Sequence, residues 1–270
     1  MKNQKKEITK FISKGFIVLK IFNANDILSI KNKIFLQIKK KLPTFSQKKI
    51  NSHFLQKYHK HVISDKEHQK IIDQSIRFIN IDQKLISKIK KNKKLENILL
   101  NYWGHKKFII KWVGSLKKKE IKNNASGFRI TRPYNRHCKN SDAAGEHCDL
   151  HVGGVVSNDQ KILVTLWTPI IGLTRAYTLR IAPGSHNFNH PFNRIIKQKK
   201  SISRVLNKTY LKKFKFLRLN LKFGEVVCFH PNLIHGGSIN LGKNTRISTE
   251  IRLFNSQRIK FFPNSLKPTL

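Results

Sequence analysis

The sequence predicts a mainly β protein with flanking helices, in which a jelly-roll core follows an N-terminal helical layer. Up to Gly104 the apolar residues recur with the period of amphipathic helices. Beyond Gly104 they gather into short runs bounded by turn residues, as strands do. Eight such runs indicate a closed or double-sheet β architecture, for which a jelly roll is the natural candidate. Because no internal repeat or low-complexity linker divides the chain, we expect one domain spanning residues 1–270.

The first part of the chain is expected to be mainly helical, with one early strand at 16–19 after a short helix. Asn25 and Asp26 are suitable N-caps for the next helix, which Pro43 would end. No period is clear from 47 to 61, so this segment is expected to be a loop or a short helix. Three apolar stripes predict amphipathic helices, the last of which would end at Gly104. The stripes are Ile27, Ile30, Ile34, Phe35, Ile38 and Leu42; Ile71, Ile72, Ser75, Ile76 and Ile79; and Leu85, Ile89, Leu95, Ile98, Leu99 and Tyr102.

The second part of the chain supplies the predicted strands. They are 108–113, 128–131, 147–156, 162–169, 177–182, 217–223, 226–230 and 246–253. The basic segment 190–213 shows no clear period and is expected to be a long insertion between strands. Long loops in compact domains are often functional, so this insertion is a candidate cover for the site.

The composition is strongly basic, with 55 Lys and Arg against 14 Asp and Glu and a net charge of +41. Such a charge suggests nucleic acid, an anionic membrane surface or an acidic substrate as partner. The excess is mostly lysine spread along the chain, which favours a solvated surface over a dedicated polyanion site. Three cysteines without a C-x-x-C pair indicate neither a disulfide framework nor a zinc knuckle, and fit a reducing cytoplasm. No apolar stretch predicts a signal peptide or a transmembrane helix.

A candidate metal site is centred on His147-Cys148-Asp149, around which three of the scarce acidic residues gather. In an extended strand His147 and Asp149 would share one face, while Cys148 would point away. A second imidazole would complete the 2-His-1-carboxylate triad that holds non-haem Fe(II) and leaves positions open. The tripeptide is not specific by itself. His235, which follows a strand ending at His230-Pro231, is the predicted third ligand.

Arg246 and Ser248 are the candidate anchors of a second ligand. They lie at alternate positions of a predicted strand, so both side chains reach the same face. A guanidinium binds a carboxylate through two parallel hydrogen bonds, and a serine hydroxyl adds one donor. This pair suits the distal carboxylate of a dicarboxylic cosubstrate whose other end chelates the metal.

Taken together, these motifs resemble the phytanoyl-CoA dioxygenase family of Fe(II)/2-oxoglutarate oxygenases. The resemblance rests on His147-x-Asp149, Trp167-Thr168-Pro169, the 180–186 stretch with Pro183-Gly184-Ser185-His186, the 224–230 stretch, and His235 followed by Arg246. It implies a double-stranded β-helix, cupin-like core at 126–256, with a mainly helical layer at 1–125 and a C-terminal tail at 257–270.

The resemblance also implies a chemistry. His147, Asp149 and His235 would be catalytic iron ligands, Arg246 would bind 2-oxoglutarate, and O2 would be the oxidant. The reaction would hydroxylate a C–H bond of a small-molecule or carrier-linked substrate and release succinate and CO2. Asp149 favours hydroxylation, because relatives that halogenate have a small residue at that position.

The substrate contacts are the least specific part of the sequence. The candidates are Arg132, Tyr134, Asn135, His151, Trp167 and Arg180. His186 and His230 are expected to be structural. The basic charge suggests an anionic small molecule, and the sequence carries no signal for an oligomeric state. Two alternatives stay open. The first is a nucleic-acid-directed oxygenase like the AlkB demethylases, which the net charge of +41 and the six-residue spacing of Arg246 and Arg252 suggest, but which the scarcity of aromatic residues among the basic runs disfavours. The second is a non-catalytic basic jelly-roll binding protein.

Overall fold

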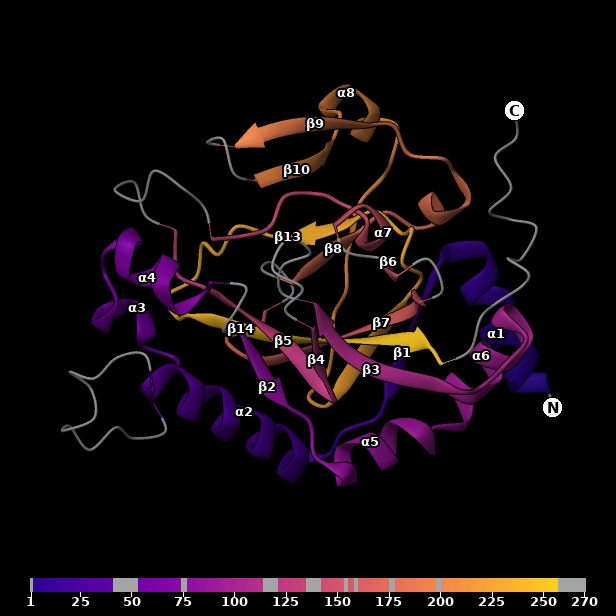
Figure 1. Cartoon of the computed structure of the whole chain (residues 1–270), viewed down its shortest axis with the longest axis horizontal. Coiled ribbons are helices and arrows are strands. Elements are labelled where there is room, and N and C mark those ends of the chain that lie inside the picture. Colours follow the sequence, from indigo (N-terminus) through magenta and orange to yellow (C-terminus); the bar gives the residue numbers. More distant parts are fainter. Residues whose placement is uncertain are drawn as a thin grey trace.

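The structure is a computed structural model that describes residues 2–40, 53–73, 77–113, 121–134, 142–152, 155–157, 160–174, 178–197 and 201–256. In this part of the chain a nine-stranded sheet packs against a three-stranded sheet, and helices cover the outer face of the larger one (Figure 1). Apolar side chains from both sheets, including Trp167, Leu179, Ile181 and Phe229, join in one cluster between them. The mainly β class with flanking helices and a jelly-roll core is confirmed.

The described helices are α1 (Lys2–Lys14), α2 (Ala24–Lys39), α3 (Tyr58–His61), α4 (Asp65–Ile71), α5 (Gln83–Lys90), α6 (Lys93–Trp103), α7 (Asp149–Val152) and α8 (Lys208–Leu211), with a 3-10 turn η3 (Ser185–Asn187). The strands are β1 (Phe16–Lys20), β2 (Phe78–Asn80), β3 (Phe108–Val113), β4 (Ile121–Asn123), β5 (Ala125–Thr131), β6 (Val155–Ser157), β7 (Gln160–Ile171), β8 (Leu179–Ile181), β9 (Phe192–Lys197), β10 (Ser201–Leu206), β11 (Leu217–Arg218), β12 (Glu225–Phe229), β13 (His235–Gly237) and β14 (Arg246–Asn255).

Strand β14 lies near the middle of the large sheet and separates the core from the site. The sheet runs β1-β12-β7-β14-β3-β4, and β5 also pairs with β14. The odd-numbered residues Ile247, Ile251 and Leu253 are buried in the main apolar cluster, which includes side chains from α2, α5 and α6. From Arg246 to Arg252 the even-numbered residues are polar and carry their side chains to the opposite face, because successive side chains of a strand alternate. The interior of the jelly roll is therefore polar on this strand.

Helix α2 packs its isoleucine stripe against the sheet, as predicted, but begins earlier than expected. Asn23, rather than Asn25 or Asp26, is the N-cap: its side chain accepts a hydrogen bond from Asp26 N, and the Asp26 carboxylate accepts one from Asn23 N. This reciprocal pair is a capping box. Figure 1 shows α2 and α5 side by side beneath the large sheet.

Two helical predictions need correction. The stripe expected to run from Ile71 to Ile79 ends with α4 at Ile71, and Ile79 lies in β2, opposite Ser126 of β5. A β-branched isoleucine fits a strand at least as well as a helix. The stripe from Leu85 to Tyr102 is two helices, since the Asn92 side chain caps the Leu95 N–H and starts α6 afresh.

Several strand predictions are also wrong in detail. Residues 147–156 do not form one strand: His147 makes an isolated bridge, Asp149 begins the short helix α7, and β6 covers Val155–Ser157. The segment 190–213 contains the hairpin β9–β10 and helix α8, above the small sheet in Figure 1, rather than an irregular insertion. The 217–223 run shortens to β11. The 1–125 layer contributes β1 to β4 to the large sheet, so it is less purely helical than expected.

None of the described helices is long and apolar enough to cross a membrane.

Candidate metal centre

The two imidazoles of the predicted triad are brought together by a backbone bridge. His147 N donates to His235 O at 2.8 Å, and His235 N donates to His147 O at 3.0 Å, so the two residues are antiparallel partners. Directly opposed residues carry their side chains on the same face. The ring centroids consequently lie 4.4 Å apart. His147 and His235, which lie far apart in the sequence, thus form one side of the site.

Asp149 completes the cluster from the first turn of α7. One possible ligand atom from each of His147, Asp149 and His235 lies within 4.8 Å of the others. The Asp149 Oδ1 to His235 Nε2 distance is 4.0 Å. In the described part of the chain this is the one group of three or more His, Cys, Asp or Glu side chains that could hold a metal ion. Cys148 points away into a small apolar cluster with Ala182, as predicted.

Both histidines are held in the tautomer that a metal needs. His147 Nδ1 lies 2.7 Å from the carbonyl oxygen of Gly145, and His235 Nδ1 lies 3.0 Å from that of Leu233. Because a carbonyl only accepts hydrogen bonds, each Nδ1 carries the proton and each Nε2 keeps its lone pair. Such a hydrogen bond behind a metal-binding histidine fixes its orientation. Burial, together with the neighbouring His235, also keeps the pKa of His147 well below its ordinary value, so the ring is neutral.

The Asp149 carboxylate is fully buried, yet it is ionised. Thr165 Oγ1 donates to Asp149 Oδ2 at 2.5 Å, and Arg252 Nη2 donates to Oδ1 at 2.8 Å. Burial by itself raises the pKa of Asp149, but the charge of Arg252, assisted by the hydrogen bond from Thr165, opposes it, and the pKa lies well below its ordinary value. Two imidazoles with their Nδ1 atoms engaged by backbone carbonyls and an ionised carboxylate form the donor set of a non-haem Fe(II) centre. The residues present therefore fit that metal.

Arg252 was not predicted to touch the metal centre. Its Nη2 is shared between Asp149 and Glu250, and its guanidinium lies 5.6 Å from the Trp112 ring centroid. The available signal was the alternation of β14, since Arg252 shares the inward face with Arg246 and Ser248.

The predicted cosubstrate anchors line the same cavity as the two histidines. Arg246 and Ser248 lie opposite Thr131 and Arg129 of β5. Arg246 Nη1 donates to Ser238 O at 3.0 Å, and Nη2 donates to Thr131 Oγ1 at 3.1 Å. Burial, assisted by Arg129, lowers the pKa of Arg246 to about 10, which leaves it charged at neutral pH. The cavity is lined by Arg129, Ala144, His147, Trp167, Leu179, His235, Gly236, Gly237, Arg246, Ser248 and Glu250.

The predicted substrate residues divide into three groups. Trp167 lines the cavity. Arg132 is not among the lining residues: it is buried and bound by Asp142, Asp65 and the carbonyl of Ile63, so it ties the α3–α4 region to the sheet. Tyr134 and Arg180 also lie outside the lining set, Tyr134 exposed and Arg180 paired with Glu146. Asn135 and the His151 side chain lie outside the described residues.

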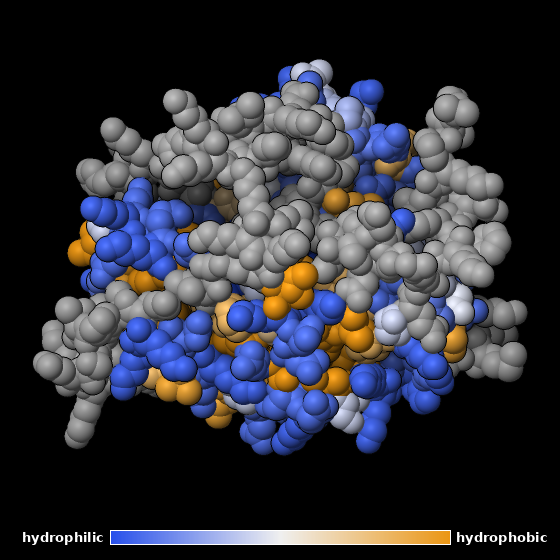
Figure 2. All heavy atoms as spheres, viewed as in Figure 1, coloured by the Kyte–Doolittle hydropathy of each residue, from blue (hydrophilic) through white to orange (hydrophobic). Residues whose placement is uncertain are grey.

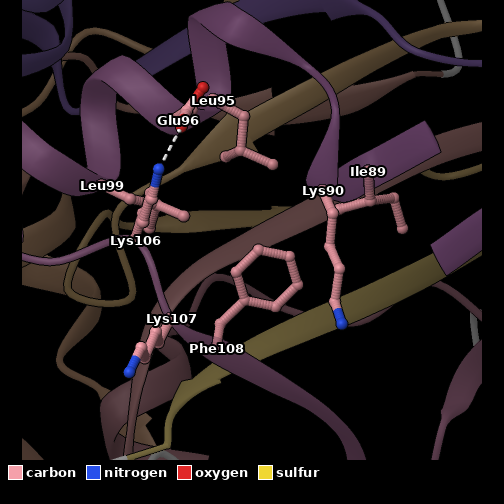
Figure 3. Close-up of a pocket in the computed structure, with 8 residues that line it drawn as sticks. All are labelled: Ile89, Lys90, Leu95, Glu96, Leu99, Lys106, Lys107 and Phe108. Atoms are coloured by element: carbon pink, nitrogen blue, oxygen red, sulfur yellow. Dashed lines mark hydrogen bonds and ion pairs between the residues drawn. The ribbon is translucent and has the colours of Figure 1, made fainter. Parts of the chain in front are cut away.

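A second pocket lies between α5, α6 and the start of β3 (Figure 3). Its lining residues are distant from the triad in the sequence. It is lined by Ile89, Lys90, Leu95, Glu96, Leu99, Lys106, Lys107 and Phe108. Lys106 is paired with Glu96 across it. The pocket has an apolar floor and lysines at its rim, but none of the metal-binding group belongs to it. We therefore place the functional site at the triad.

Comparison with known proteins agrees with this geometry. Residues 119–248 match the model of the family described as Phytanoyl-CoA dioxygenase (PhyH). No curated protein matches significantly. Similar solved structures include EctD from S. alaskensis with bound Fe (TM-score 0.55, 14% identity, 95% of this chain and 79% of that chain) and the epimerase SnoN in complex with Fe3+, alpha ketoglutarate and nogalamycin RO (TM-score 0.53, 10% identity, 100% and 93%). The carbocyclase SnoK from nogalamycin biosynthesis is also similar (TM-score 0.52, 10% identity, 93% and 84%).

Proposed function

We propose that this chain, whose residues 119–248 match the Phytanoyl-CoA dioxygenase (PhyH) family model, is an Fe(II)/2-oxoglutarate-dependent oxygenase of that family and hydroxylates a C–H bond of a small-molecule or carrier-linked substrate. The observation that carries the proposal is the convergence of His147, Asp149 and His235 beside Arg246 and Ser248 in one cavity. The cosubstrate would leave as succinate and CO2.

In this proposal the triad holds the ferrous ion through the two Nε2 atoms and an Asp149 oxygen. Three ligands on one face leave the remaining coordination positions for other molecules. When bound, the iron would couple the oxidative decarboxylation of 2-oxoglutarate by O2 to oxidation of the substrate. The carbonyls of Gly145 and Leu233 hold the rings in position, while Thr165 and Arg252 hold the carboxylate.

Arg246 and Ser248 would bind the distal carboxylate of 2-oxoglutarate. Both project from the inward face of β14 at the end away from Arg252, and Arg246 is already oriented by Ser238 and Thr131. A guanidinium fixed by neighbouring acceptors loses little freedom when a carboxylate binds. Trp167, opposite Glu250 on β7, supplies an apolar wall to the same cavity.

The substrate is proposed only as a class. EctD was solved with 2-oxoglutarate and 5-hydroxyectoine, and SnoN with nogalamycin RO, so proteins of this fold bind small molecules of different sizes. Carbocyclase and epimerase also stand among the similar structures, which shows that the fold alone does not set the reaction outcome. The Asp149 carboxylate favours hydroxylation, and the basic composition favours an anionic substrate.

Succinate release tests the proposal without a known substrate. The purified protein with Fe(II), ascorbate, 2-oxoglutarate and O2 should release succinate slowly, and a panel of candidate acids, phosphosugars and CoA esters should be screened for stimulation. The variant Asp149→Ala should abolish the release, whereas Lys84→Gln, an exposed change on α5, should keep it. Succinate formed equally by wild type and Asp149→Ala would rule out the proposed centre.

A further inference from the structure

Arg129 occupies a position in the oxygenase cavity that no sequence motif identified. It lies on β5 directly opposite Ser248 of β14, and it lines the cavity together with both triad histidines, Trp167 and Arg246. Cross-strand partners share a face of the sheet, so the guanidinium of Arg129 enters the interior next to the Ser248 hydroxyl. Arg129 and Arg246 therefore flank Ser248 on the wall of the same cavity.

The guanidinium of Arg129 makes no hydrogen bond or ion pair with any described residue. Arg252, on the same wall, differs because it binds both Asp149 and Glu250. The Glu250 carboxylate lies 2.5 Å from Arg252 Nη2 and is paired with that guanidinium. It therefore stabilises the positive charge of Arg129 electrostatically, without a hydrogen bond. Burial lowers the pKa of Arg129, but a guanidinium remains protonated at neutral pH. Arg129 is half-buried, and a cation that is partly withdrawn from water without an acceptor is destabilising, which suggests that a bound anion completes the site.

The charges of the cavity point to a dianion. Four guanidinium groups lie in or beside the cavity, those of Arg77, Arg129, Arg246 and Arg252. They are opposed by two carboxylates, those of Asp149 and Glu250. A ferrous ion would add two positive charges to this surplus, and 2-oxoglutarate carries two negative charges.

We propose that Arg129 is a second cationic binding residue for 2-oxoglutarate. Arg129 and Arg246 would bind the cosubstrate from the two sides of Ser248. This inference rests on the proposed function, because it assumes that 2-oxoglutarate is the cosubstrate. It implies that one arginine is not enough to hold the dianion in this cavity. It also implies that a monoanionic keto acid binds much more weakly than 2-oxoglutarate.

Equilibrium binding to the Mn(II)-loaded protein tests the role of Arg129 without turnover. The dissociation constants of 2-oxoglutarate and of pyruvate, which lacks the distal carboxylate, are measured calorimetrically for wild type, Arg129→Gln, Arg129→Lys and Arg246→Gln. Lys84→Gln removes one exposed positive charge and serves as the control. Loss of a hydrogen-bonded charge partner should weaken 2-oxoglutarate binding about 10- to 100-fold in Arg129→Gln. Arg129→Lys should fall between Arg129→Gln and wild type.

The outcomes separate this inference from the proposed function. A loss confined to 2-oxoglutarate supports Arg129 as a partner of the distal carboxylate, and an equal loss for pyruvate supports it as a partner of the keto-acid carboxylate. Unchanged 2-oxoglutarate affinity in Arg129→Gln, with Mn(II) affinity and melting temperature also unchanged, overturns the inference while leaving the proposed function standing. A wild-type protein that binds neither Mn(II) nor 2-oxoglutarate would overturn both.

Discussion

At the scale of single residues, the site is defined by how each ligand is held. The two histidines owe their orientation to backbone carbonyls, whereas Asp149 owes its charged state to Arg252 and Thr165. A buried carboxylate that lost its cation would be left uncompensated, which costs about 3–5 kcal/mol in comparable pairs. Arg252 is therefore a positioning residue for the metal ligand.

Substitution of Arg252 should weaken metal binding. We expect Arg252→Met to bind Co(II), a spectroscopic substitute for Fe(II), about 10- to 100-fold more weakly than wild type, because changes behind metal ligands have effects of that size. Arg252→Lys should restore part of the affinity. Titration of the visible Co(II) bands measures this, with circular dichroism as the check on folding. Equal Co(II) affinity in a folded Arg252→Met protein would show that Arg252 does not support Asp149.

At the scale of helices and strands, the sequence predicted which elements carry the chemistry better than it predicted the residues at which those elements begin and end. The strand of Arg246 and Ser248 was predicted because alternation of polar and apolar residues is a local signal. The bridge between His147 and His235 was not, because a single antiparallel pair leaves no periodic trace. The sequence placed Asp149 on a strand, whereas it begins a helical turn. Arg129 and the Arg252 contact to Asp149 were missed because strand register is not encoded in spacing along one strand.

Helix ends were the weakest part of the prediction, since several polar residues compete for each N-cap. The α2 N-cap provides a test. Asn23→Ala should lower the free energy of unfolding by about 1 kcal/mol, because it removes the capping-box acceptor for Asp26 N. Asn25→Ala, in the exposed first turn, should leave stability unchanged or slightly higher. Urea unfolding of both variants measures the difference, and the reverse order would contradict the Asn23 cap.

At the scale of the whole molecule, the described helices on one side of the large sheet are rich in lysine. Figure 2 shows hydrophilic residues, with hydrophobic ones between them, over the lower half, where Figure 1 places α2 and α5. These helices carry lysines on their solvent side and isoleucines on their buried side. These lysines lie outside the cavity lined by the triad histidines.

This distribution predicts how nucleic acid should behave. A surface of this charge should bind single-stranded DNA with an affinity that falls steeply with salt. Because Arg252, which suggested the nucleic-acid-directed alternative, is committed to Asp149 and Glu250, we expect DNA not to stimulate succinate release. Stimulation by DNA at physiological salt would instead favour the nucleic-acid-directed enzyme.

Buried neutral histidines should make the whole fold sensitive to mild acid. Burial lowers the pKa of His68 to about 4 despite the Asp142 carboxylate 3.3 Å away, and burial lowers that of His186 to about 4. The unfolded chain therefore binds more protons than the folded one between about pH 6.5 and pH 4. Stability should be complete above this window and fall as the pH drops through it, by at most about 3 kcal/mol for each histidine. Urea unfolding from pH 7.5 to 4 measures this, and a flat profile would contradict it.

The most direct measurement of the central claim is the visible spectrum of the anaerobic protein with Fe(II) and 2-oxoglutarate. Chelation of a triad-bound ferrous ion by the keto acid should give a weak charge-transfer band in the wild type and in Lys84→Gln. The band should vanish in His235→Ala, and Arg246→Gln should need much more 2-oxoglutarate to produce it. Absence of the band in folded wild-type protein, or an undiminished band in His235→Ala, would show that His147, Asp149 and His235 do not form the iron site.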